Sequence, residues 1–433
     1  MTWFKTVLTM GFRYSAGGLP RLLLACFLAV MLFSAAAGPT LTLDDLLRLG
    51  LSANPAVLAA RDQVAAARGM AEAARAFPNP EISGQSGRGQ EREVPDPHSG
   101  SVYTIALNQP LEYPMVRTPR IEAADASLNA ADAARQSFEN DAAAAIKLAY
   151  YDLLRRQAEA AAAQEDLQLT QQIRDHIALR YGTGESPKFD LITAETELLN
   201  ARKNRDMALL RVQQARISLR QAVGKPIPED AQVTGELPNA VSMPPLAKLQ
   251  EELQARNPEL QRTEAEGRAA ESRVDLEKAQ RLPKISLLAQ HDVDPTLSSS
   301  RVGMAVTIPI WDRRSGQVMQ AQAELSRTRN LLDSQRLSLS ESLAAAYGRF
   351  QIASSQVSML EHELLAQAAA AQKIAEAAYR YGERGILEWL NAQRTYRAAR
   401  NELITARYDL AAVAVEIDRI RAQPVSTSVS SKP

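Results

Sequence analysis

Histidine and its acidic neighbours are the side chains of this sequence best suited to metal binding or catalysis, and they are few. The chain has four histidines, which are His98, His176, His291 and His362. His362 precedes Glu363 as in a zinc-protease helix, but no second histidine follows four residues after the first. The sequence also lacks a Gly-x-x-x-x-Gly-Lys phosphate loop and any pattern that predicts a nucleophile with its base. We therefore expect no catalytic residue, and the energy for any transport must come from a partner protein.

The acidic run that follows His291 is the nearest approach to a metal site. Asp292 and Asp294 could begin a calcium loop, yet Gly303 occupies the twelfth position, where an EF-hand requires Glu. A polar loop between two strands explains the run better. The sequence thus predicts neither a metal site nor a cofactor.

The composition excludes further classes of protein. Its 50 basic and 50 acidic residues balance, whereas a nucleic-acid partner requires a basic excess. One cysteine among 433 residues rules out a disulfide framework and a zinc site built from cysteines. Only 5% of the residues are aromatic, and alanine-rich stretches occur throughout, as is typical of long helices packed side by side. These features favour a transport or scaffold protein over an enzyme.

Residues 1–37 have the pattern of a secretory signal peptide. Three basic residues precede an uncharged apolar run over 22–33, and small residues follow up to Ala37 and Gly38. This run is shorter than the ~20 residues that a transmembrane helix needs. Cleavage after Ala37 leaves 47 basic and 50 acidic residues and no cysteine. Lipidation of Cys26, which follows a loose lipobox, and retention of the segment as an anchor are the alternatives.

The strongest signal is an internal repeat with a period of about 200 residues. Residues 51–58 recur at 253–260, each around an Asn-Pro pair, and residues 190–194 recur at 388–392. We divide the chain into a first repeat over 38–223, a linker over 224–246, a second repeat over 247–421 and a disordered tail over 422–433. Each repeat should contain a short helix, two strands and a long helical hairpin.

Hydrophobic periodicity predicts the same helices in both repeats. Short helices over 55–76 and 258–281 should begin at the Asn-Pro pairs. Long helices over 119–181 and 315–381 should be followed by return helices over 189–223 and 387–421. Apolar residues recur every seven positions in both long helices, which predicts left-handed supercoiling. These are Ile146, Leu153, Ala160 and Leu167 in the first, and Leu343, Phe350, Val357 and Leu364 in the second.

Segments of alternating polarity predict strands between the short and long helices. Beyond residue 40 no uncharged apolar run of 18 residues occurs, so an α-helical membrane protein is excluded, whereas membrane strands are not. We expect one face of two strands, over 102–109 and 301–309, to lie against lipid. Its residues are Tyr103, Ile105, Leu107, Val302, Met304, Val306 and Ile308.

Each of these strands should pair with a neighbour, over 81–90 and 285–290, which gives four strands per chain. Bacterial barrels need at least eight strands, and open edges are prohibitive in lipid. The chain must therefore form an oligomer if its strands lie in a membrane.

The signal peptide, the tandem repeat and the Asn-Pro and Tyr-Gly signals together resemble the TolC-type outer-membrane efflux proteins, over residues 41–421. The resemblance implies a mainly α-helical fold with a small β part. Three chains would share a 12-stranded β-barrel in the outer membrane, continued by a barrel of coiled-coil helical hairpins across the periplasm. Residues 77–81, Phe-Pro-Asn-Pro-Glu, look most like the branch that serves cobalt, zinc and cadmium efflux. The implied partners are two further copies of the chain, outer-membrane lipid, a periplasmic adaptor protein and an inner-membrane pump of the resistance-nodulation-division type.

The resemblance also implies that the turns of the two hairpins dock the adaptor. These tips contain Arg180, Tyr181, Gly182 and Gly184 in the first hairpin, and Arg380, Tyr381, Gly382 and Gly385 in the second. Chain reversal at the helix ends would by itself account for the glycines. When Arg-Tyr-Gly at 180–182 is matched to Arg-Tyr-Gly at 380–382, the first tip is two residues longer than the second.

Acidic residues just past the tips are candidates for a gate at the pore entrance. The resemblance implies that Glu388 lies in a ring of three carboxylates that selects cations, and Asp190 occupies the matching place in the first repeat. Asn391 stands where some relatives carry a second acid. The alternative is that an acidic first turn simply complements the helix dipole.

The sequence therefore predicts a passive outer-membrane exit duct, with heavy-metal cations as its substrates. A multidrug efflux channel and a type I secretion channel are alternatives with the same plan. A periplasmic coiled-coil adaptor or scaffold is the second alternative, although an adaptor should have one hairpin rather than two.

Overall fold

The computed structural model describes residues 40–90, 99–228 and 231–422, and the chain divides into two compact units. The smaller unit comprises Met1–Leu41 and Ile227–Thr234. In its described part, β1 (Thr40–Leu41) pairs in parallel with β4 (Gln232–Val233). The predicted signal peptide, with Cys26, and the predicted tail after residue 422 lie outside the described residues.

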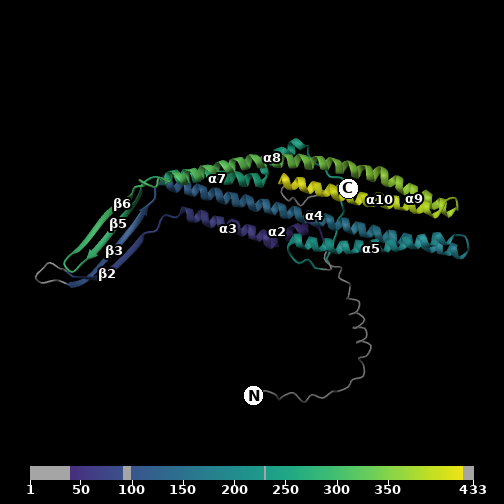
Figure 1. Cartoon of the computed structure of the whole chain (residues 1–433), viewed down its shortest axis with the longest axis horizontal. Coiled ribbons are helices and arrows are strands. Elements are labelled where there is room, and N and C mark those ends of the chain that lie inside the picture. The colour runs from purple at the N-terminus through teal and green to yellow at the C-terminus, as the bar shows by residue number, and fades with distance from the viewer. Residues whose placement is uncertain (1–39, 91–98, 229–230, 423–433) are drawn as a thin grey trace, which may run out of the picture. The chain divides into compact units, whose positions relative to one another are not determined.

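The larger unit contains all the other described elements, in the same order in both repeats (Figure 1). The first repeat has α2 (Leu43–Ala53), α3 (Pro55–Arg75), β2 (Glu81–Gln90), β3 (Ser99–Leu111), α4 (Pro114–Gly182) and α5 (Lys188–Val223). The second has α6 (Leu246–Arg256), α7 (Pro258–Ala279), β5 (Lys284–Val293), β6 (Ser298–Thr307), α8 (Ser315–Met359), the π-helical turn η1 (Leu360–Leu364), α9 (Leu365–Arg380) and α10 (Ile386–Ile420). The predicted helices and strands are present, whereas α2 and α6 are not predicted by the sequence pattern.

An asparagine closes the same junction in each repeat. Asn54 caps α3 and also donates from Nδ2 to the carbonyl of Ala222, in the last turn of α5, at 3.3 Å. Asn257 caps α7 and donates to the carbonyl of Ile420, at the end of α10, at 2.7 Å. One side chain therefore joins the start of a short helix to the end of a return helix. This explains why Asn precedes Pro in both repeats.

The seven-residue pattern forms the buried seam of the long helices, with one correction. The predicted positions of α4 are buried: Ile146, Leu153, Ala160 and Leu167. In the second hairpin the pattern fails at Leu364, which is 44% exposed, and Leu365 packs against the core in its place. The cause is η1, because a π turn adds one residue and shifts the seam by one position. The prediction for Leu364 is wrong because counting in sevens assumes an uninterrupted α-helix.

The four strands of this unit form one antiparallel sheet in the order β2-β3-β5-β6. Its register aligns Leu107 with Ala289 and Ala289 with Val302. Residues directly opposite in an antiparallel sheet share a face, so the apolar residues predicted on β3 and β6 lie on one face. Their side chains are exposed in the single chain. β6 ends at Thr307, so Ile308 lies outside the strand that was expected to contain it.

The acidic run after His291 is not the loop that the sequence suggested. His291 and Asp292 belong to β5, and only Asp294 lies in the turn to β6. There the Asp294 carboxylate accepts hydrogen bonds from the amides of Thr296 and Leu297 at 2.9 and 2.7 Å. The first turn, over 91–98, lies outside the described residues.

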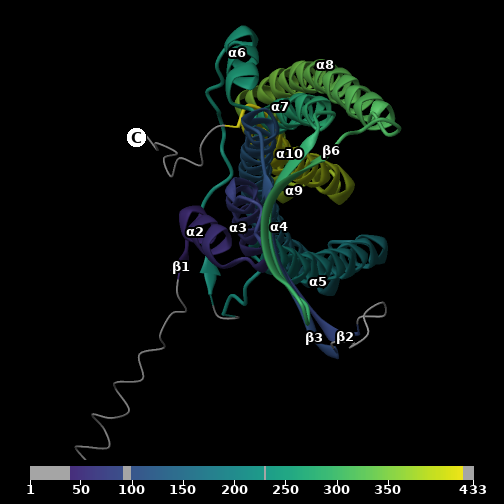
Figure 2. The same cartoon turned by 90° about the vertical axis from the view of Figure 1, so that its left-hand side faces the viewer.

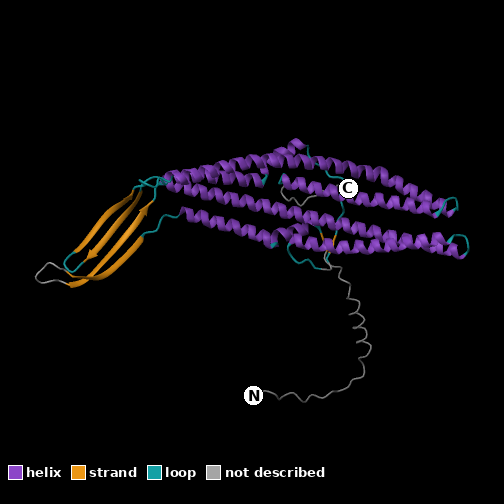
Figure 3. Cartoon of the chain, in the orientation of Figure 1, coloured by secondary structure: helices purple, strands orange, loops and turns teal. Residues whose placement is uncertain are grey.

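The helices of this unit form a row rather than a closed bundle. α5 packs on α4, α4 on α10, and α10 on α8 and α9, while α3, α4, α7 and α8 form a second row. Figure 2 shows the first row as an arc from α8 through α10 and α4 to α5. Figure 3 shows the strands gathered in a sheet apart from the helices. The hydrophobic core consists of the seams between neighbouring helices, so the helices at the ends of a row each keep a free side.

Gly224 provides a test of the asparagine junction. Its φ is 71°, and a Cβ atom at this position would lie 2.5 Å from Cγ of Asn54. We expect Gly224→Ala to lower the free energy of unfolding by about 1 to 3 kcal/mol, because the backbone is strained and Asn54 is displaced from its contact with Ala222. Gly69→Ala is the control, since Gly69 lies in α3 with open space around it. That variant should gain up to about 1 kcal/mol. Thermal unfolding of the detergent-solubilised chain measures both, and equal midpoints would contradict the expectation.

Candidate functional site

The first tip is a five-residue turn over 183–187 between α4 and α5. Gly184 has a φ of 80°, which favours glycine. The carbonyl of Arg180 accepts hydrogen bonds from the amides of Glu185 at 2.8 Å and Ser186 at 3.2 Å. These bonds satisfy the end of α4 and reverse the chain.

The second tip, over 381–385 between α9 and α10, has the same geometry. Gly382 has a φ of 76°, and the carbonyl of Ala378 accepts from the amides of Glu383 at 2.9 Å and Arg384 at 3.3 Å. Each of these residues lies 198 positions after its counterpart in the first tip. The two tips therefore have equal length, and the expected difference of two residues is wrong.

The error comes from the shared tripeptide Arg-Tyr-Gly. The hydrogen bonds make Gly184 the counterpart of Gly382, so Arg380 corresponds to Gly182 and not to Arg180. The two tripeptides are similar in sequence but lie two residues apart in the turn. Asp190 and Glu388, by contrast, are true counterparts in the first turns of α5 and α10.

The predicted tip residues lie at the surface, and the two arginines among them are paired with acids. Arg180 faces Glu185 at 3.4 Å, and Arg380 faces Glu376 at 2.6 Å. Tyr381 is 83% exposed. The other predicted tip residues are also exposed. Tyr181 and Gly182 end α4, whereas Gly184, Gly382 and Gly385 lie in the turns, and the space around the four glycines is open.

The candidate gate residues differ in their surroundings. The exposed Glu388 carboxylate, in the first turn of α10, is held at 3.0 Å by Arg384 of the tip turn. Asp190 is half-buried, and Asn391 is exposed. Sequence reasoning missed Arg384, because it lies in the turn before α10 and the turn geometry brings it to Glu388.

A cluster of apolar and aromatic residues joins the two hairpins just behind the tips. Tyr379 of α9 stacks on Trp389 of α10, with ring centroids 5.2 Å apart, and both are buried. The guanidinium of Arg180 lies 5.4 Å from the Tyr379 ring centroid. Ile173 and Ile177 of α4 complete the contact. The position of Trp389, one residue past Glu388, was available in the sequence as a signal because the chain has only three tryptophans.

Both tips also carry exposed apolar side chains that sequence reasoning missed. Phe189 and Leu387, which are counterparts in the two tips, are 63% and 51% exposed. Leu179 is 68% exposed. With Tyr381, each hairpin therefore has two exposed apolar side chains at or beside its tip.

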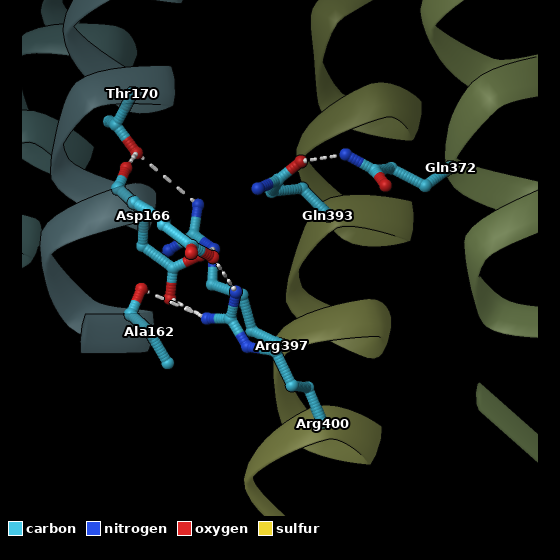
Figure 4. Close-up of polar contacts among 8 residues, drawn as sticks. Ala162, Asp166, Thr170, Gln372, Gln393, Arg397 and Arg400 are labelled. Atoms are coloured by element: carbon cyan, nitrogen blue, oxygen red, sulfur yellow. Dashed lines mark hydrogen bonds and ion pairs between the residues drawn. The ribbon is translucent and has the colours of Figure 1, made fainter. Parts of the chain in front are cut away.

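Farther from the tips, a buried ionic cluster ties α4 to α10 (Figure 4). Arg400 donates to the Asp166 carboxylate at 2.7 Å and to the carbonyl of Ala162 at 3.0 Å. Arg397 approaches Asp166 at 3.8 Å and donates to the hydroxyl of Thr170 at 3.4 Å. Asp166 and both arginines have side chains no more than 15% exposed.

Burial works against both charges of this cluster. It raises the pKa of Asp166, although the nearby Arg400 and Arg397 oppose that rise. Burial likewise lowers the pKa of Arg397. The cluster therefore fixes how α4 and α10 meet more than it adds net stability, since desolvation offsets much of the attraction between buried charges.

The described residues offer neither a clustered metal site nor an apolar spanning helix. No group of three or more His, Cys, Asp and Glu side chains there is arranged to hold a metal ion. Among the helices described, none has the length and apolar character needed to cross a membrane.

Comparison with known proteins finds similarity in both repeats. The family described as outer membrane efflux protein matches residues 46–225 and 249–421. The chain is 26% identical to the cobalt-zinc-cadmium resistance protein CzcC of Cupriavidus metallidurans, over 89% of this chain and 90% of that protein. Two solved structures are similar in fold. The outer membrane protein VceC of Vibrio cholerae has a TM-score of 0.75 at 19% identity, over 88% of this chain and 95% of that one. The MtrE outer membrane channel of Neisseria gonorrhoeae has 0.74 at 18%, over 88% of each chain.

Arg400 allows a test of the buried cluster. Arg400→Met should lower the free energy of unfolding by about 3 to 5 kcal/mol at neutral pH, because it leaves the buried Asp166 carboxylate with the weaker contact to Arg397. Removing this cation raises the pKa of Asp166 in the folded chain further above its unfolded value. The folded variant then binds the proton more tightly than the unfolded chain does. The deficit is therefore largest above the folded-state pKa of Asp166 in the variant and shrinks as the pH falls through it toward the folded-state pKa of the wild type.

The control for this test is Arg349→Met, since the ion pair of Arg349 with Glu416 at 3.0 Å is largely exposed. That change should cost no more than about 1 kcal/mol. Urea unfolding of the full chain in detergent, at several pH values, measures both variants. A loss for Arg400→Met that does not vary with pH would contradict the role given to Asp166.

Proposed function

Because the chain belongs to the outer membrane efflux protein family, we propose that it forms a homotrimeric exit duct for heavy-metal cations. An inner-membrane pump, of the resistance-nodulation-division type, would deliver the cations through a periplasmic adaptor. Transport through the duct is then passive, and the chain performs no catalysis. The observation that carries the proposal is that the family matches each of the two repeats in turn.

Self-association is supported by the free sides at the two ends of the helix row. At one end, α5 carries an exposed apolar stripe on the side away from α4, made of Ile192, Leu199, Leu210 and Ile217. At the other end, α8 and α9 carry a stripe made of Ile352, Met359 and Ile374, which Tyr381 extends into the tip. The residues of the second stripe are separated by multiples of seven positions, except for one extra residue between Met359 and Ile374. The π turn η1 contributes that residue. Regular spacing of this kind is typical of a helix surface that packs against another helix.

The sheet also has two ends that the single chain leaves unpaired. β2 and β6 are its two edges, and their outer backbone groups would be costly to leave unpaired in lipid. Chains arranged head to tail around an axis would bring β6 of one copy to β2 of the next, and α8 and α9 of one copy to α5 of the next. The same rotation would thus cover both the edges of the sheet and the ends of the helix row. The number three comes from the resemblance to the family.

The tips are the proposed contact with the adaptor. Each copy has exposed apolar side chains there, from Leu179, Phe189, Tyr381 and Leu387. The tips also carry Arg180 and Arg380, each in an ion pair with a nearby acid. The proposed cation gate is Glu388, with Asp190 beside it in the ring. Arg384 partly neutralises Glu388, so the entrance would be less negative than the acid alone implies.

Heavy-metal cations are proposed because the protein CzcC, whose name gives cobalt, zinc and cadmium, matches along nearly its whole length. Channels for drugs or for secreted proteins would share the same architecture, so the substrate needs its own experiment.

The stripes predict the effect of a charge on assembly. Leu210→Glu and Ile374→Glu, one in each stripe, should each weaken association by more than tenfold. The reason is that burying a carboxylate without a partner costs roughly 2 kcal/mol or more. Phe138→Glu is the control, since Phe138 is 39% exposed on α4, which has a neighbouring helix on both sides in each row and lies outside both stripes. Native mass spectrometry in detergent gives the oligomeric state. Wild-type assembly of both stripe variants would rule out this packing.

A growth experiment tests the substrate. A strain that lacks this chain should lose tolerance to zinc, cobalt or cadmium several-fold, and the wild-type chain should restore it. Loss of tolerance to drugs alone would overturn the assignment to metals.

The same strain can report on the entrance. Glu388→Gln should restore metal tolerance less well than the wild type, whereas Arg384→Gln should restore it at least as well, because it frees the Glu388 carboxylate. Equal growth with both variants, at equal amounts of trimer, would remove Glu388 from the gate.

A further inference from the structure

The apolar face of the sheet contains no carboxylate. The two acidic residues of the four strands, Glu81 and Asp292, both lie on the opposite face, as do Lys284 and Arg301. The apolar face carries exposed side chains such as Ile82, and a single arginine. That arginine is Arg88 of β2.

Arg88 lies at the far end of this face, near the turn to β3. It is opposite Ser101, on the same face as Ile82 and six residues further along β2, which is about 20 Å at ~3.4 Å per residue. Its side chain is exposed and has no hydrogen bond or ion pair within the part of the chain that the structure describes. Arg88 is therefore a cation without a protein partner among the described residues, at the end of an apolar surface.

The side chains between the apolar rows and Arg88 are those of a membrane interface. Tyr103 lies one row before Arg88, and its ring centroid is 6.3 Å from that of His291. His291 Nδ1 also lies 2.9 Å from the hydroxyl of Ser300. Amphipathic rings of this kind gather at the level of lipid headgroups. Their position puts Arg88 beyond the hydrocarbon, at the depth of the headgroups.

The strand that assembly would place beside Arg88 supplies no anion. In the proposed trimer β2 pairs with β6 of the next copy, and β6, Ser298–Thr307, contains neither Asp nor Glu. The partner of Arg88 must then come from outside the strands of the protein.

We propose that Arg88 binds a phosphate group of lipid A in the outer leaflet. The inference rests on the proposed function, since it requires the sheet to lie in the outer membrane. A guanidinium can donate two parallel hydrogen bonds to a phosphate, and an anion at this depth neutralises a cation that hydrocarbon would reject. The apolar rows contact the acyl chains, while Arg88 fixes the lipid by its headgroup.

The test measures lipid A retained by the full-length trimer in detergent. Purified protein is incubated with bisphosphorylated lipid A, and bound lipid is counted by native mass spectrometry. The wild type should retain lipid A, and Arg88→Gln should retain at least fivefold less. Arg88→Lys should retain an intermediate amount, because it keeps the charge but loses the paired hydrogen bonds.

The matched control moves the charge to the other face. Gly87 lies on the polar face, and a Cβ atom added there would meet open space, so the double variant R88Q/G87R keeps the net charge and the strand. It should retain as little lipid A as Arg88→Gln. Arg301→Gln, which removes a cation from the polar face, should retain as much as the wild type.

The outcomes distinguish a failure of the phosphate contact from a failure of the proposed function. Equal retention by the wild type and Arg88→Gln, or full retention by R88Q/G87R, overturns the phosphate contact while leaving the duct in place. A wild-type chain that retains no lipid A and is released from cells without detergent would instead contradict the proposed function. Should Arg88→Gln fail to form trimers, the comparison of Arg88→Lys with the wild type decides, because equal retention by these two proteins would exclude a paired contact to phosphate.

Discussion

The structure depends on one constraint: a single chain buries the seams between its neighbouring helices but cannot bury the sides at the ends of the row. Ile146 and Leu153 lie in a seam and are fully buried, whereas Leu199 and Leu210 on α5 are mostly exposed. A four-helix bundle would close on itself and hide all such residues. The row stays open because α5 and α8 occupy its two ends. In the proposed trimer, other copies of the chain would supply the remaining hydrophobic stabilisation.

The repeat makes this open row possible. Both halves place a strand pair between a short helix and a long hairpin, and in both an asparagine ties the short helix to the return helix. The two halves then need one more interaction to meet in a fixed way. The Asp166 and Arg400 pair supplies it between α4 and α10, and behind the tips the packing of Ile173 and Ile177 of α4 against the Tyr379 and Trp389 stack supplies it. Polar and aromatic contacts are directional, so they fix the relation of two seams that hydrophobic packing alone would let slide.

Local periodicity predicted most of the fold, because side chains at fixed spacing share a face whatever the rest of the chain does. The seam of α4 and the shared face of β3 and β6 follow from that rule alone. The π turn did not follow from it, because an inserted residue changes the phase without a signal in composition. The register of the tips was also missed. Two similar tripeptides matched in sequence, whereas backbone hydrogen bonds and the positive φ of Gly184 and Gly382 decide the turn.

The candidate site was harder to predict because its properties depend on partners from distant segments. Glu388 was recognisable as an acid in a first helical turn, but Arg384 changes its effective charge. Asp166 gave no signal, since it is one of 50 acidic residues and only burial between α4 and α10 makes it unusual. The sheet obeys a simpler rule. Charged side chains are destabilising on a strand face that meets hydrocarbon, and the four strands place Glu81 and Asp292 on the other face. Charge is thus sorted by face of the sheet, and the four strands supply no anion on the face that carries Arg88.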